Sequence, residues 1–134
     1  MTNKVTDADW MLKAMIALAA ADDRLNAREV GVIQRIYQEQ TGRSVDASVV
    51  VLAVQTYATK RDAIAELSTA AGSMSQETKE EIVRAACLTL LADESVSAGE
   101  SKKLRAIAAA LRMSESRLEE ILGGLKGDWG GERS

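Results

Sequence analysis

The spacing of apolar residues along the chain is typical of helices. Met11, Met15 and Leu18 recur at intervals of four and three, which places them on one face of a helix. Helical spacing of this kind, together with residues that suit helix ends, predicts seven helices. They span about 7–21, 27–40, 46–58, 60–71, 76–92, 98–111 and 115–124. The expected fold class is therefore all-α, a compact bundle of about seven helices.

Residues that favour helix N-termini stand just ahead of most of these segments. Ser, Thr and Asn side chains accept hydrogen bonds from the free N–H groups of a first turn. The expected starting residues are Thr6, Asn26, Ser44, Ser75, Ser97 and Ser114. The run Val49–Leu52 also fits a β-strand, because it is apolar and mostly β-branched. We favour a helix there, since the chain offers no second strand to pair with it.

The chain contains an internal repeat. Residues 13–37 and 84–108 align without a gap, 71 positions apart. In both copies an apolar helix leads into a short acidic turn and then a second helix. The matched polar residues are Asp22 with Asp93, Asp23 with Glu94, Asn26 with Ser97, and Glu29 with Glu100. The pattern predicts two helix–acidic turn–helix units related by a pseudo-two-fold axis, with the two apolar helices side by side at the centre.

Helix capping explains part of this repeat. In a capping box the cap side chain accepts a backbone N–H of the first turn, and a glutamate three residues later accepts the N–H of the cap. Two pairs have this spacing, Asn26 with Glu29 and Ser97 with Glu100. Capping does not explain Asp22 and Asp93. They follow helix C-termini, where the helix dipole disfavours negative charge.

The acidic turns also suggest a binding site for a hard cation. Calcium and magnesium prefer oxygen ligands, which carboxylates and turn carbonyls supply. The spacing is not that of an EF-hand, because Asp22 and Glu29 are only seven positions apart. We therefore expect any site to be looser than an EF-hand, or shared between the two turns. The candidate metal ligands are Asp22, Asp23, Glu29, Asp93, Glu94 and Glu100.

The composition excludes several kinds of catalysis. The chain has no histidine, no proline and one cysteine among its 134 residues. Without histidine there is no Ser-His-Asp or Cys-His mechanism, and no zinc or haem held by histidine. A single cysteine forms no internal disulfide, which fits a reducing compartment. We expect this residue, Cys87, to be a small buried hydrophobe.

The charge balance is weakly acidic. With 17 basic and 20 acidic residues the formal net charge is −3, so we expect no nucleic-acid partner. The modest basic patch of Arg84, Lys102, Lys103 and Arg105 is interpreted as a solvated face. The apolar run over residues 14–21 is too short to cross a membrane, and no basic region of a secretory signal precedes it. These features favour a cytoplasmic protein without direct membrane insertion.

The doubled motif resembles that of the TerB-like family, the tellurite-resistance TerB proteins and their relatives. That family shows an A-D-G-x-[IL]-x-x-x-E pattern twice, and the two copies here read A-D-[DE]-x-[LV]-[NS]-A-x-E. Residues 107–122 are similar to the family's C-terminal ending, and the resemblance covers about residues 7–123. One difference is that Asp23 and Glu94 stand where the family usually has glycine, for which a left-handed turn is cheap.

The resemblance implies a compact all-α bundle, a role in tellurite resistance or general stress response, and divalent-cation binding by the motif acids. It implies no established enzyme activity. We accordingly expect one domain over residues 1–134, with its core at about 7–123 and a flexible Gly-rich tail over 124–134.

Three functional hypotheses follow. The first is a non-enzymatic interaction module that binds protein partners and responds to calcium or magnesium. The second is a metal-dependent hydrolase that uses the acidic turns. The third is a plain homo-oligomeric helical scaffold.

Overall fold

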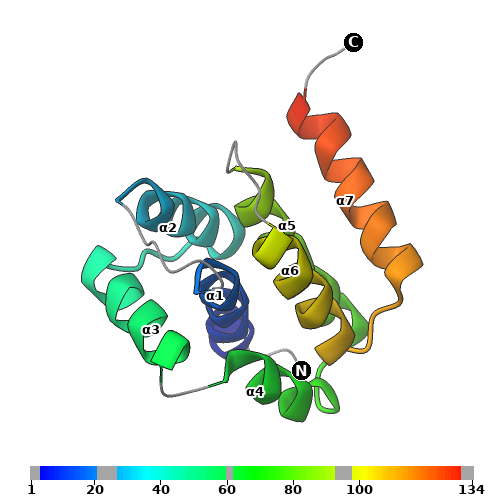
Figure 1. Cartoon of the computed structure of the whole chain (residues 1–134), viewed down its shortest axis with the longest axis horizontal. Coiled ribbons are helices and arrows are strands. Elements are labelled where there is room, and N and C mark those ends of the chain that lie inside the picture. The colour runs from blue at the N-terminus through cyan, green and yellow to red at the C-terminus, as the bar shows by residue number, and fades with distance from the viewer. Residues whose placement is uncertain (1–3, 21–26, 60–61, 93–97, 131–134) are drawn as a thin grey trace.

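A computed structural model shows seven helices in the described part of the chain, residues 4–20, 27–59, 62–92 and 98–130 (Figure 1). They are α1 (Lys4–Ala19), α2 (Ala27–Thr41), α3 (Ala47–Thr59), α4 (Ala63–Ala71), α5 (Gln76–Leu91), α6 (Ala98–Ala110) and α7 (Glu115–Gly130). These residues contain no strand, so the all-α prediction is confirmed and the run at 49–52 is helical.

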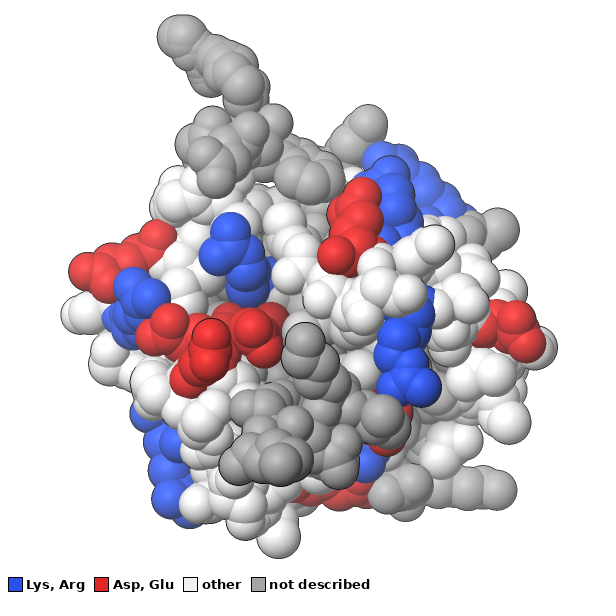
Figure 2. All heavy atoms as spheres, turned by 180° about the vertical axis from the view of Figure 1, so that it is seen from behind, with Lys and Arg blue, Asp and Glu red and all other residues white. Residues whose placement is uncertain are grey.

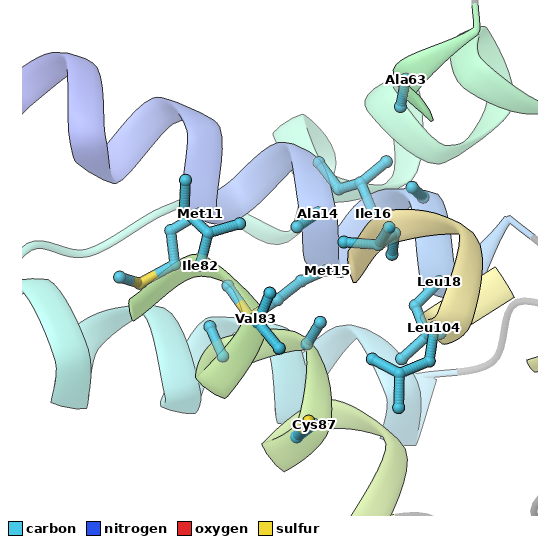
Figure 3. Close-up of a cluster of buried hydrophobic side chains, with 14 of the residues drawn as sticks. Met11, Ala14, Met15, Ile16, Leu18, Ala63, Ile82, Val83, Cys87 and Leu104 are labelled. Atoms are coloured by element: carbon cyan, nitrogen blue, oxygen red, sulfur yellow. The ribbon is translucent and has the colours of Figure 1, made fainter. Parts of the chain in front are cut away.

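Helix α1 lies in the middle of the molecule, with α3 and α7 at opposite ends (Figure 1). It contacts α2, α3, α4, α5 and α6, and its most extensive contact is with α5. Met15 and Leu18 of α1 are completely buried, as are Ile82, Val83 and Cys87 of α5 (Figure 3). The expected central pair of apolar helices is therefore present. The pseudo-two-fold relation between the two units stays a prediction.

Local hydrogen bonds explain where several helices begin. Ser75 caps α5 by accepting the N–H of Thr78 at 3.1 Å, and Ser114 caps α7 by accepting the N–H of Arg117 at 3.2 Å. Both caps confirm the prediction. Helix α3 begins later than Ser44 suggested. The carbonyl of Asp46 accepts the N–H of Val50 at 3.2 Å, so the first turn is built on this aspartate.

Two predicted helix limits are wrong. Thr6 does not cap α1, because that helix already begins at Lys4, two residues before Thr6. Helix α7 does not end at 124 but continues to Gly130. Gly123 and Gly124 lower helix propensity, yet Leu125 beyond them is buried, and that packing favours continuation of the helix. Residues 131–134 lie outside the described part.

The end of α6 has an unusual backbone conformation. The N–H of Met113 donates to the carbonyl of Ala108 at 2.9 Å, and the N–H of Arg112 donates to that of Ala109 at 2.9 Å. This is the Schellman arrangement, in which the residue after the cap adopts a left-handed conformation, usually as glycine. Here that residue is Arg112, with φ of 61°. A non-glycine residue in this region costs about 1–2 kcal/mol.

Polar contacts fasten the outer helices to the core. The guanidinium of Arg117 on α7 donates from Nε and Nη2 to the two carboxylate oxygens of Glu80 on α5, both at 2.9 Å. This bidentate hydrogen bonding lowers the pKa of Glu80. On the other side, Glu66 of α4 accepts the hydroxyl of Tyr57 at 3.1 Å and pairs with Lys13 of α1 at 3.1 Å.

A glycine inside α2 and a glycine directly after it differ in whether their backbone conformation suits another residue. Gly31 lies within the helix, and an added Cβ would meet nothing within 4 Å, whereas Gly42 ends the helix with φ of 75°. We expect Gly31→Ala to stabilise the fold by up to about 1 kcal/mol, because glycine weakens a helix interior. We expect Gly42→Ala to destabilise it by about 1 kcal/mol or more. Urea unfolding measures both, and equal effects would contradict this account.

The strain at Arg112 gives a second test. Arg112→Gly relieves the left-handed conformation, so the free energy of unfolding should rise by about 0.5–1 kcal/mol after the entropy of glycine in the unfolded chain is subtracted. The matched control is Arg112→Ala, which removes the same side chain but keeps the strain. A stabilisation by alanine equal to that by glycine would show that the side chain, rather than the backbone, is responsible.

Candidate functional site

A pocket of about 70 Å³ lies where the ends of α1 and α5 meet the beginnings of α2 and α6. Four helices contribute to its lining, which consists of Ala19, Arg28, Glu29, Val32, Ile33, Thr89, Ala92 and Glu100. Half of these residues are apolar, and the polar ones include two glutamates. The pocket thus joins one glutamate from each copy of the repeated acidic motif.

Both glutamates occupy the same position of their helix. Glu29 is the third residue of α2, and Glu100 is the third residue of α6. This is the capping-box position, and each helix begins directly after the predicted cap, Asn26 or Ser97. The two caps lie outside the described residues. The local sequence therefore fixes where each glutamate sits, and the packing of α1 against α5 brings the two helix starts together.

Burial distinguishes the two glutamates. Glu100 is only 4% exposed. Among the described residues, Glu100 and Thr78 are the two polar residues that are buried. Glu29 is half-buried. A buried carboxylate is costly unless hydrogen bonds or opposite charges satisfy it, and neither glutamate is without a partner. The N-termini of α2 and α6 also favour negative charge at this place.

Two further polar residues were not predicted from the sequence. Arg28 stands beside Glu29 at the start of α2, and Thr89 lies in the last turn of α5. The Thr89 hydroxyl donates to the carbonyl of Ala85 at 2.9 Å. The repeat could not reveal them, because their counterparts 71 positions away are Gly99 and Leu18. The pocket is therefore asymmetric, with a cation and a hydroxyl contributed by one copy each.

The structure describes two of the six acidic residues predicted as metal ligands. It brings Glu29 and Glu100 into one pocket. The other four acids, Asp22, Asp23, Asp93 and Glu94, lie outside the described residues. Within the described ranges, no group of three or more His, Cys, Asp or Glu side chains is placed to hold a metal ion. Cation binding at the acidic turns thus stays a proposal.

Other chemistry is limited by burial. The side chain of Cys87 is fully buried in α5, as predicted, and desolvation raises the pKa of its thiol to about 12. It is therefore protonated at neutral pH and is a poor nucleophile. None of the described helices has the length and apolar character needed to cross a membrane.

The fold and pocket define a helical domain organised around two glutamate-bearing helix starts. A family model described as tellurite resistance protein TerB matches residues 12–122. Because this match covers most of the chain, the chain belongs to the TerB family, as the doubled motif indicated. No curated protein and no solved structure matches it.

The capping interpretation can be tested directly. Replacing Asn26 or Ser97 by alanine should lower the free energy of unfolding by about 1 kcal/mol, because each change removes an acceptor for the first-turn N–H groups. Ser68→Ala, at an exposed position inside α4, is the control and should cost nothing, since alanine is the better helix former. Urea unfolding of the three variants decides the matter. No loss at either cap would show that the capping boxes are not formed.

Proposed function

We propose that the chain is a non-enzymatic interaction module of a tellurite-resistance-like stress response, and that its pocket binds a divalent cation. Family membership supports the first part. The observation that carries the second is the meeting of Glu29 and Glu100 in one pocket. These residues come from the two acidic motifs, so a single ion could be shared between both turns.

The chemistry of the lining favours a hard cation over other ligands. Calcium and magnesium take oxygen ligands, and magnesium usually keeps several waters. A pocket of about 70 Å³ has room for an ion with part of its hydration shell. Among the described lining residues, the two glutamates and Thr89 are the side chains that supply oxygen atoms. Arg28 offsets part of the negative charge, which favours a weak site that responds to ion concentration.

Binding is a better assignment for this pocket than hydrolysis. The described lining contains no histidine, cysteine or lysine, so it has no nucleophile next to a strong base. Its threonine hydroxyl donates to a backbone carbonyl rather than to a carboxylate. We accordingly assign the acidic turns a role in ion-dependent stability and partner binding.

A thermal-shift experiment tests the cation site. An ion that binds only the folded protein stabilises it by RT ln(1 + [L]/Kd), which is about 2.7 kcal/mol at 100 times Kd. Calcium or magnesium should therefore raise Tm by several degrees over sodium chloride of equal ionic strength. Glu29→Gln with Glu100→Gln should remove this increase. Glutamine still serves in a capping box, so the caps are kept.

Two further variants complete the design. Asp22→Asn with Asp93→Asn should also abolish the ion-dependent increase, with little loss of stability in the absence of the ion. Glu119→Gln, at an exposed position of α7, is the control and should retain it. If the native chain shows no increase in Tm beyond the effect of ionic strength, the cation site is wrong and only the interaction module remains.

A further inference from the structure

The outer face of α6 carries a row of cations. Lys102 and Arg105 are exposed on α6, and Arg112 is exposed just past its end, whereas the half-buried Lys103 lines a separate pocket with residues of α1, α3 and α4. The one acidic residue of α6, Glu100, is buried in the pocket on the inner side. None of the ion pairs between described residues involves these four cations. Lys102, Arg105 and Arg112 form what we call the α6 basic face.

The spacing of these cations defines the length of ligand that fits them. At a rise of about 1.5 Å per residue, α6 runs about 12 Å from Lys102 to its last residue, Ala110, and Arg112 lies two residues past that end. An extended peptide covers about 12 Å with about four residues. Small side chains separate the cations, since Ala109 is exposed and Ala106 is half-buried. The surface between the long basic side chains is therefore formed by small side chains.

Arg112 marks one end of the face at a cost in backbone strain. It holds the left-handed conformation that glycine adopts more readily. Its guanidinium also lies beside Gly72, at the end of α4, within about 4 Å of where a Cβ would stand. Glycine at this position would make the fold more stable, whereas arginine adds a positive charge. This points to a use for the side chain outside the fold.

Acidic side chains limit the α6 basic face on the side of α5 and α7. These two helices pack against α6, whose most extensive contact is with α4. The half-buried or exposed glutamates on these two helices are Glu77, Glu80, Glu81, Glu115, Glu119 and Glu120. Figure 2 shows acidic side chains gathered on the back of the molecule, with basic ones around them. A long polyanion would run from the cations onto repelling carboxylates, whereas a short anionic segment would not.

We propose that the α6 basic face docks a short acidic peptide segment of a partner protein. The chain as a whole carries a net charge of −3, so attraction of this kind is confined to this face. A nucleic acid would extend past it onto the acidic side chains of α5 and α7. An anionic membrane is disfavoured because the large apolar residues of α6 point inward, where Leu104 and Ile107 are buried. The proposal rests on the interaction role proposed above but not on cation binding.

Fluorescence anisotropy with a labelled peptide of alternating Asp and Glu residues tests the docking. The full chain is titrated in EDTA at about 50 mM salt, so that charge interactions are not screened away and no divalent ion takes part. Lys102→Glu with Arg105→Glu should weaken binding about tenfold. Arg35→Glu on α2 with Arg43→Glu just after that helix makes the same change in net charge at exposed positions elsewhere and should weaken binding by less than about threefold.

Arg112 supplies a readout that a purely structural role would not give. Arg112→Gly should bind the peptide more weakly although it unfolds at higher urea concentration, and Arg112→Lys should bind as the native chain does. Equal losses for the α6 and α2 double variants, or no binding by the native chain, would overturn the proposal. So would a stronger dependence of phosphatidylserine-vesicle or short-duplex DNA binding on Lys102 and Arg105 than of peptide binding. A failure here leaves the ion-dependent Tm increase untouched, so the two proposals are judged separately.

Discussion

The whole arrangement depends on the burial of α1. This helix is apolar on nearly all sides, and Ala14, Met15 and Leu18 have no exposed surface. A helix that is apolar on nearly all sides is stable only when other helices bury it. Five helices provide that enclosure, with α5 in the most extensive contact. Alanines such as Ala85 and Ala86, also completely buried, keep the side chains between the helices short, so that the backbones approach closely.

The candidate site is a consequence of this packing. Because α1 and α5 lie side by side, the helices that follow them, α2 and α6, begin close together, and each presents a glutamate from its first turn. Local sequence places each carboxylate, and the central helix pair places one beside the other. The same helix α6 turns its acidic residue inward and its cations outward. Ion binding at its start and partner binding on its outer face would therefore act on one rigid element.

The sequence predicted those features that depend on nearby residues. Ser75 and Ser114 cap their helices because the N–H groups they accept lie within three positions. Thr6 was misassigned because a cap residue marks a start only where the chain before it is not helical. The length of α7 and the place of Thr89 in the pocket depend on distant contacts that no local pattern contains. Arg112 is the clearest case, since glycine is the residue expected in its conformation.

The burial of Cys87 has a consequence for the chemistry of the domain under oxidative conditions. It is the one cysteine of the chain, and oxidation to a sulfenic acid or a mixed disulfide proceeds through an accessible thiolate. At position 87 the thiol is enclosed and protonated, so such a reaction must wait until the core opens. The folded domain therefore lacks a thiol redox switch.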